Sequence, residues 1–181
     1  MKHVCITSLW LLSVVCLYGQ ETSNHAPLSV AYFSQFGFQP GLAIGTAIPL
    51  IESADNVFLL RPQLGFFARP GNDRNWMLQL ALGRSRQGNK PGAYSAFSLG
   101  VGVLAQSRLL SETTALGNGE RISQKRERNT YLVPTLGYEY GRSIGPKLGW
   151  YLKPSIGARL TSTDSPTPTL MVEIGLNWYA R

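Results

Sequence analysis

Large apolar side chains recur at every second position of the final segment of the chain, and this period constrains the fold more than any other feature. Every even position from Leu170 to Trp178 carries Leu, Val, Ile or Trp, whereas the odd positions include Glu173, Gly175 and Asn177. A period of two is that of an extended strand, whose successive side chains point to opposite faces. The segment is therefore expected to be a strand whose even-numbered side chains meet an apolar environment and whose odd-numbered side chains meet a confined one.

Seven further segments show the same alternation and are separated by turn-rich sequence. The eight expected strands lie at residues 28–38, 41–50, 57–68, 75–86, 93–106, 130–141, 148–160 and 169–179. Their connections contain Gly, Pro, Asn, Asp and Ser, as in RPGNDR and QGNKPG. An even number of antiparallel strands is typical of up-and-down barrels that close on themselves.

The second face of each expected strand distinguishes a membrane barrel from a soluble one. Opposite the apolar positions, segments 41–50 and 93–106 carry Gly, Ala and Ser rather than Lys and Glu. Small residues suit the narrow lumen of an eight-stranded barrel, whereas a water-facing wall is usually rich in charge. The predicted fold is therefore all-β, an eight-stranded antiparallel up-and-down transmembrane β-barrel with its large apolar face toward lipid. A soluble barrel with that face inward is the alternative.

The N-terminal segment has the pattern of an export signal. A basic start precedes an apolar run from Ile6 to Leu17, and Gly19 offers a small residue for cleavage. An uncleaved interfacial anchor is the alternative. We expect a signal peptide over residues 1–19, a tail over 20–26 and the barrel domain over 27–181. Both cysteines lie in the expected signal peptide, so no disulfide framework is predicted.

Charged residues on the inward parity are expected to fill the lumen. They are Arg61, Glu139, Lys153, Arg159 and Glu173. Pairing across the short turns places Arg159 diagonal to Glu173, and Lys153 diagonal to Glu139, so the sequence predicts these two ion pairs. In so narrow a barrel, interlocked side chains leave little room for solutes to diffuse through the lumen. A narrow gated conductance stays open as an alternative.

Aromatic residues gather near the ends of the expected strands. If the termini are periplasmic, Trp76 falls near the outer membrane interface. The residues expected near the inner interface are Tyr138, Tyr140, Trp150 and Trp178. Two such levels correspond to the aromatic girdles of membrane barrels. Ordinary core aromatics of a soluble barrel are the alternative interpretation.

The longest connection, residues 107–129, is predicted to be an extracellular loop without structure of its own. Its basic residues are Arg108, Arg121, Lys125, Arg126 and Arg128. Contact with lipopolysaccharide phosphates or with an external ligand is one interpretation, and a merely solvated loop is the other. The chain has 17 basic and 10 acidic residues. Without an aromatic-basic binding pattern, lipid headgroups are the expected anionic partners, rather than nucleic acid.

The signal peptide, the strand count and the terminal strand LMVEIGLNWYAR together carry a resemblance. The chain resembles the small eight-stranded outer-membrane β-barrel proteins of Gram-negative bacteria, and is similar to the transmembrane domain of outer-membrane protein A and its short relatives. The resemblance covers residues 27–181. It implies a location in the outer membrane and insertion by the barrel-assembly machinery.

Catalysis is not expected from this sequence. Barrels of the family that the chain resembles include acyltransferases and lipid A deacylases, whose chemistry needs a base beside a nucleophile, most often His. The two histidines are His3, in the expected signal peptide, and His25, in the expected tail. No metal or cofactor is predicted. Two functions stay open: a structural or surface-interaction barrel, and an accessory or transport component, such as a secretion-associated subunit with an unknown protein partner.

Overall fold

The structure, a computed structural model, describes residues 26–35, 39–53, 56–69, 73–116, 119–161 and 165–179. The expected signal peptide and all but the last residue of the expected tail lie outside these ranges. The described residues form nine strand elements. They are β1 (Leu28–Gln35), β2 (Gln39–Thr46), β3 (Ile48–Glu52), β4 (Asn56–Arg69), β5 (Asp73–Gln87), β6 (Ala93–Leu116), β7 (Gly119–Ser143), β8 (Leu148–Arg159) and β9 (Thr167–Trp178). No helix in this part of the chain is long and apolar enough to cross a membrane.

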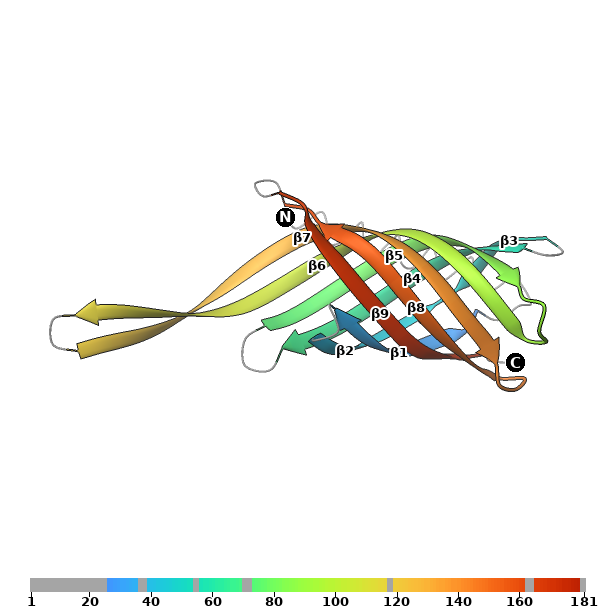
Figure 1. Cartoon of the computed structure of the whole chain (residues 1–181), viewed down its shortest axis with the longest axis horizontal. Helices are drawn as coiled ribbons and strands as arrows, with labels where there is room; N and C mark the ends of the chain where they lie inside the picture. Colours follow the sequence, from blue (N-terminus) through green and yellow to red (C-terminus); the bar gives the residue numbers. More distant parts are fainter. Residues whose placement is uncertain are drawn as a thin grey trace, which may run out of the picture.

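The strands close into a barrel (Figure 1). β2 and β3 both pair with β4, so they form one wall strand interrupted at Ala47. From β4 to β9, each strand pairs antiparallel with the next. β1 joins β2 on one side and β9 on the other, which completes the wall. The predicted eight-stranded antiparallel up-and-down barrel is confirmed, with one wall strand divided in two.

The strands are strongly tilted. Following paired residues once around the wall from Gln39 leads back to the same wall strand at Pro49, ten residues further along. A barrel with such a stagger tilts its strands by about 35–45°, and Figure 1 shows them crossing the long axis obliquely. The register shifts between Pro49 and Ile51. At this width side chains alone can fill the interior.

The side chains on the two faces of each strand have different surroundings, as the alternation predicts. On β9, Ile174 and Trp178 are 56% and 61% exposed, whereas Met171 and Glu173 are each 1% exposed. The same outward exposure of large apolar side chains recurs on every wall strand. Such an apolar exterior is unfavourable in water, and closing the sheet through β1 leaves no open edge there, as a span through hydrocarbon requires. The chain is therefore a membrane-spanning barrel of the outer-membrane type.

The interior contains an apolar layer and a charged layer at different levels along the barrel axis, and buried polar side chains such as Gln35 and Asn75 lie beside the apolar layer. A buried apolar cluster comprises Ala31, Phe33, Ala43, Phe67, Met77, Leu104, Val133, Tyr151 and Met171. Most of it lies toward the end from which β6 and β7 project, called here the hairpin end. Toward the other end, called the terminal end because β1 starts and β9 stops there, each strand carries polar residues. On β4, for example, Arg61 precedes Phe67, and on β9 Glu173 follows Met171.

The segment 107–129 is not a loop, and its prediction as one was wrong. β6 and β7 pair continuously from Ala93 with Arg142 to Leu116 with Gly119. Pairing with β5 ends at Arg108, and the bridge to Leu160 marks the last contact of β7 with the next strand. The remainder is a two-stranded hairpin that projects beyond the wall (Figure 1). Such a hairpin needs no apolar face toward a core, so no alternation reveals its strands in the sequence.

Candidate functional site

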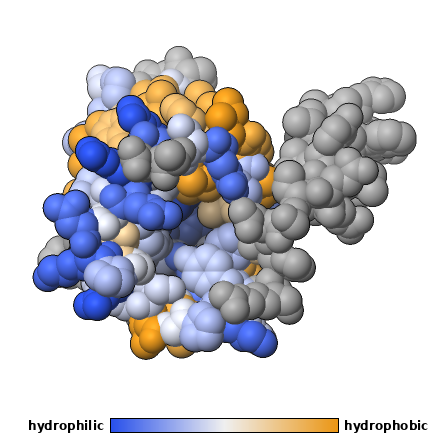
Figure 2. All heavy atoms as spheres, turned by 90° about the vertical axis from the view of Figure 1, so that its right-hand side faces the viewer, coloured by the Kyte–Doolittle hydropathy of each residue, from blue (hydrophilic) through white to orange (hydrophobic). Residues whose placement is uncertain are grey.

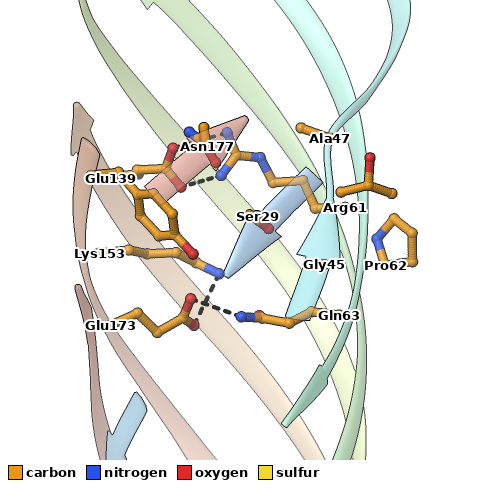
Figure 3. A pocket seen from close by; sticks show the side chains of 12 residues that line it. Ser29, Gly45, Ala47, Arg61, Pro62, Gln63, Glu139, Lys153, Glu173 and Asn177 are labelled. Carbon is orange, nitrogen blue, oxygen red and sulfur yellow. Dashed lines mark hydrogen bonds and ion pairs between the residues drawn. The ribbon is translucent and has the colours of Figure 1, made fainter. Parts of the chain in front are cut away.

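The first of two buried ion pairs in the lumen joins opposite walls. Arg61 of β4 reaches Glu139 of β7 with both terminal nitrogens, one of them 3.0 Å from Oε1. The Tyr94 hydroxyl donates to the same oxygen at 2.8 Å and accepts a hydrogen bond from Asn177 Nδ2 at 2.9 Å. Bidentate guanidinium-carboxylate contacts are among the strongest polar contacts in proteins. Figure 3 shows the pair in the lumen.

The second ion pair lies between neighbouring strands. Lys153 Nζ of β8 is 3.3 Å from Glu173 Oε1 of β9, directly opposite in the register. Gln63 Nε2 donates to the other carboxylate oxygen at 2.8 Å (Figure 3). Lys153 and Glu173 are 4% and 1% exposed. Each carboxylate thus has a cation and a neutral donor, as burial of a charge requires.

Both predicted pairings were wrong, although all four of their residues have their side chains largely buried. Arg159 lies opposite Thr167 rather than near Glu173, and its guanidinium carbon is 5.8 Å from the centre of the Tyr131 ring. The β8–β9 turn is centred two residues earlier than predicted. Each residue of β9 therefore lies opposite a residue of β8 four positions earlier in the sequence than the predicted one. Glu139 pairs with Arg61 instead of Lys153. The prediction considered only neighbouring strands, and Arg61 comes from across the lumen.

The lumen has little free space. The cavity beside the two ion pairs has a volume of about 30 Å³ and is lined by residues that include Arg61, Glu139, Lys153 and Glu173. A cavity of this size holds about two or three water molecules, because about 10–15 Å³ is enough for one. Further along, Gln79 Nε2 donates to Thr135 Oγ1 at 2.6 Å. Figure 2, which faces the terminal end, shows hydrophilic residues around a central hollow, with hydrophobic residues at the margin.

The described part of the chain lacks two residue types that often act as bases or nucleophiles. Neither histidine nor cysteine occurs in it, because both residue types lie only in residues 1–25. Within the described ranges, no group of three or more His, Cys, Asp or Glu side chains could hold a metal ion. What the arrangement provides is a polar filling that holds opposite walls together.

The aromatic residues singled out in the sequence lie on the outer wall at two levels. Trp76 lies near the hairpin end, with its ring 4.7 Å from that of Phe66. Tyr140 and Trp150 lie near the terminal end, with ring centres 5.8 Å apart. Tyr138 and Trp178 lie toward the same end and are exposed. Aromatic rings at such levels favour the headgroup regions of a bilayer.

Four of the five basic residues of segment 107–129 lie at the base of the projecting hairpin, and Arg121, opposite Thr114, lies near its far end. Arg108, Lys125, Arg126 and Arg128 have exposed side chains, whereas the side chain of Arg121 lies outside the described residues. Arg126 and Arg128 occupy the same alternate positions of β7 as Leu132, whose side chain is on the outer face. Arg74, exposed on β5, was missed by the sequence reasoning. It shares the outward parity of Trp76, and the register aligns it with Ser107 and, one strand on, Arg128.

No family model and no curated protein matches the chain. Among solved structures it is similar to Neisserial surface protein A (NspA), with a TM-score of 0.46 and 10% identity over 86% of this chain and 95% of that one. It is also similar to the N-terminal β-barrel domain of Pseudomonas aeruginosa OprF, with a TM-score of 0.44 and 15% identity over 86% and 96% of the two chains. The translocator domain of the autotransporter NalP from Neisseria meningitidis has a TM-score of 0.31 and 8% identity over 98% and 96%.

Proposed function

We propose that this β-barrel of the bacterial outer membrane has a non-enzymatic, structural role: it anchors the β6–β7 hairpin at the cell surface, where the base of the hairpin contacts lipopolysaccharide phosphates. The observation that carries the proposal is the projection of β6 and β7 beyond the wall, directly above the apolar exterior. In barrels of this type, short turns face the periplasm and long connections face outward. In this orientation the start of β1 and the end of β9 lie on the periplasmic side.

The charges at the base of the hairpin support lipopolysaccharide as the partner. Arg74, Arg126 and Arg128 are exposed on the outward parity, just beyond the level of Trp76. Phosphate groups at a membrane surface lie immediately outside the hydrocarbon, at the level of the aromatic girdle. Guanidinium groups bind phosphates through paired hydrogen bonds. The position of the three arginines next to the aromatic level supports the proposed contact.

Lipopolysaccharide binding by the full-length protein in detergent tests this proposal. The variant Arg126→Gln/Arg128→Gln should bind at least about tenfold more weakly, which corresponds to about 1.4 kcal/mol. The control Lys90→Gln/Lys147→Gln removes the same charge from turns at the terminal end and should bind like the unchanged chain. Equal binding by all three proteins would contradict the proposed contact.

The orientation has its own test on intact cells. Trypsin should cut at Lys125, Arg126 or Arg128, because these exposed residues lie on the cell surface in the proposed topology. Cleavage only after the outer membrane is opened would show that the hairpin faces the periplasm.

A role as an accessory component is the second candidate, and one observation favours it. Beyond Arg108 on β6 and Leu132 on β7, the described residues give the hairpin no neighbouring strand on either side. Such open backbone edges can accept a strand from a partner protein. A complex isolated from outer membranes with the full chain, and lost when the hairpin is shortened, would support this role over contact with lipopolysaccharide alone.

A further inference from the structure

The apolar exterior is interrupted at one place near the terminal end. On β5 the outward stripe of Leu78, Leu80 and Leu82 continues into Arg84 and Arg86, both exposed. On β7 the outward stripe continues past Tyr140 into Arg142, which is also exposed. These three residues are called here the arginine patch. β6 separates β5 from β7, so the patch extends across three neighbouring strands (Figure 1).

The register places two small residues of β6 between the arginines. Arg86 lies opposite Ser95 of β6, and Arg142 lies opposite Ala93, two residues earlier on the same strand. No bulky side chain of β6 therefore separates Arg86 from Arg142 on the outer face of the wall.

Aromatic side chains adjoin the patch on its hydrocarbon side. Arg84 lies between Phe58 of β4 and Phe97 of β6 in the register, and these rings are 46% and 53% exposed. Tyr138 lies beside Phe97 on β7. The patch therefore belongs to the level at which lipid headgroups meet acyl chains, rather than to the water-exposed turns. Arginine is tolerated at this level when its guanidinium reaches a headgroup.

The ion-paired carboxylates Glu139 and Glu173 lie in the lumen, on the other side of the wall from the patch. The Arg84 side chain donates from Nε to the neutral Asn56 Oδ1 at 3.1 Å. Arg84 and Arg86 lie two residues apart on the same face of β5, so their like charges repel each other. An external anion between the arginines would remove this repulsion and add charge-assisted hydrogen bonds.

We propose that the arginine patch binds the phosphate of an anionic phospholipid headgroup, with the acyl chains lying on the apolar wall beside Leu82 and Phe97. A lipid fits better than a soluble anion, because the patch opens toward the lipid-facing wall and continues directly into that apolar surface. The inference rests on the membrane location in the proposed function. In that orientation the patch faces the inner, phospholipid leaflet, opposite to the hairpin.

Lipid retention by the full-length protein tests the inference. The protein is purified in detergent, mixed with phosphatidylglycerol or phosphatidylcholine, and the bound lipid is counted by native mass spectrometry. The unchanged chain should retain phosphatidylglycerol in preference to phosphatidylcholine. Arg84→Gln/Arg86→Gln should reduce that preference at least about tenfold, the ratio that corresponds to about 1.4 kcal/mol. Lys90→Gln/Lys147→Gln, with the same loss of charge at the same end, should retain it.

A second variant keeps the arginines and changes only the small residue opposite Arg86. Ser95→Asp places a carboxylate beside Arg86 and should displace the lipid, whereas Ser95→Ala should not. Unchanged lipid preference in both Arg84→Gln/Arg86→Gln and Ser95→Asp overturns the inference, as does an equal loss in the lysine control. Displacement by millimolar inorganic phosphate alone would show a phosphate site without a lipid contribution, which also overturns it.

The outcome can be separated from that of the proposed function. Each variant is first checked for a folded barrel by its faster migration on a detergent gel without heating. A chain that inserts into membranes yet shows no preference for phosphatidylglycerol refutes only the arginine patch. A chain recovered as a soluble protein refutes the membrane location itself.

Discussion

Glu173 is almost fully buried, and Lys153 is the cation beside it. Removing either charge leaves the other in the lumen without its partner, and such a change costs on the order of 3–5 kcal/mol. We therefore expect Lys153→Met and Glu173→Leu each to lower the free energy of unfolding by about this amount. The double variant should lose clearly less than the sum, because an apolar pair leaves no uncompensated charge. Urea unfolding in detergent micelles measures all three.

Arg159 provides the matched control for this cycle. It lies opposite Thr167, six residues from Lys153 along β8, or about 20 Å at the rise of a strand. Changes at Arg159 and Glu173 should therefore be additive within about 0.5 kcal/mol. Strong coupling between these two residues, together with none between Lys153 and Glu173, would show that the register of the last hairpin is wrong.

Two glycines test how tightly the wall is packed. A Cβ added at Gly41 would lie 2.2 Å from the Phe66 carbonyl oxygen and 2.5 Å from Phe67 Cβ, so β2 and β4 would have to separate. At Gly145, in the β7–β8 turn, nothing lies within 4 Å of an added Cβ. We expect Gly41→Ala to destabilise the barrel by about 1–3 kcal/mol or more, and Gly145→Ala to have little effect. Equal unfolding midpoints for the two variants would contradict the close approach of β2 to β4.

At the residue scale the sequence predicts which way a side chain points, but not what it meets. Parity alone puts Glu139, Lys153 and Glu173 in the interior, and all three are buried. Their partners depend on the stagger of the whole sheet, which brings Arg61 of β4 across the lumen to β7. A two-residue error in the position of one turn was enough to assign Glu173 to Arg159. The sequence did not reveal the arginine patch, because its only sign in the sequence is that each arginine follows the apolar residues on the same face of its strand.

At the scale of the elements, the projecting hairpin is expected to be separable from the barrel. Beyond Leu109 and Arg126 the two strands pair only with each other among the described residues. Replacing residues 110–125 with Asn-Gly, which favours a tight two-residue turn, should leave the barrel folded. The shortened chain should still migrate faster without heating, with an unchanged urea midpoint. A large loss of stability would mean that the hairpin packs against the wall.

Element positions were predictable wherever a strand has a lipid-facing side. All eight predicted segments coincide with wall strands, since each must alternate between lipid and a cramped lumen. The failures occur where that requirement ends. The continuation of β6 to Leu116 and the start of β7 at Gly119 lie beyond the wall. The interruption at Ala47 separates β2, paired on both sides, from β3, which pairs only with β4. Neither feature has an apolar period that would mark it in the sequence.

At the scale of the whole molecule, the two layers of the lumen close the barrel in different ways. Phe33 and Phe67, with ring centres 5.3 Å apart, belong to the apolar cluster toward the hairpin end. The ion pairs fill the part nearer the terminal end, where the cavity measures only about 30 Å³. A hydrated ion would have to displace both layers. The arrangement favours a sealed anchor over the narrow pore that the sequence left open.

Planar-bilayer recording provides the test of this closure. The unchanged chain should show no steady conductance, because Phe33 and Phe67 occupy the lumen toward one end and the ion pairs of Arg61 and Lys153 occupy it toward the other. The variant Phe33→Ala/Phe67→Ala removes both rings and should admit water through the apolar layer, so that only the ion pairs oppose passage and brief openings appear. Its fold is verified beforehand on an unheated gel. Steady current through the unchanged chain would refute the sealed lumen and support the transport role instead. A folded double variant as silent as the unchanged chain would show that the ion pairs alone close the barrel.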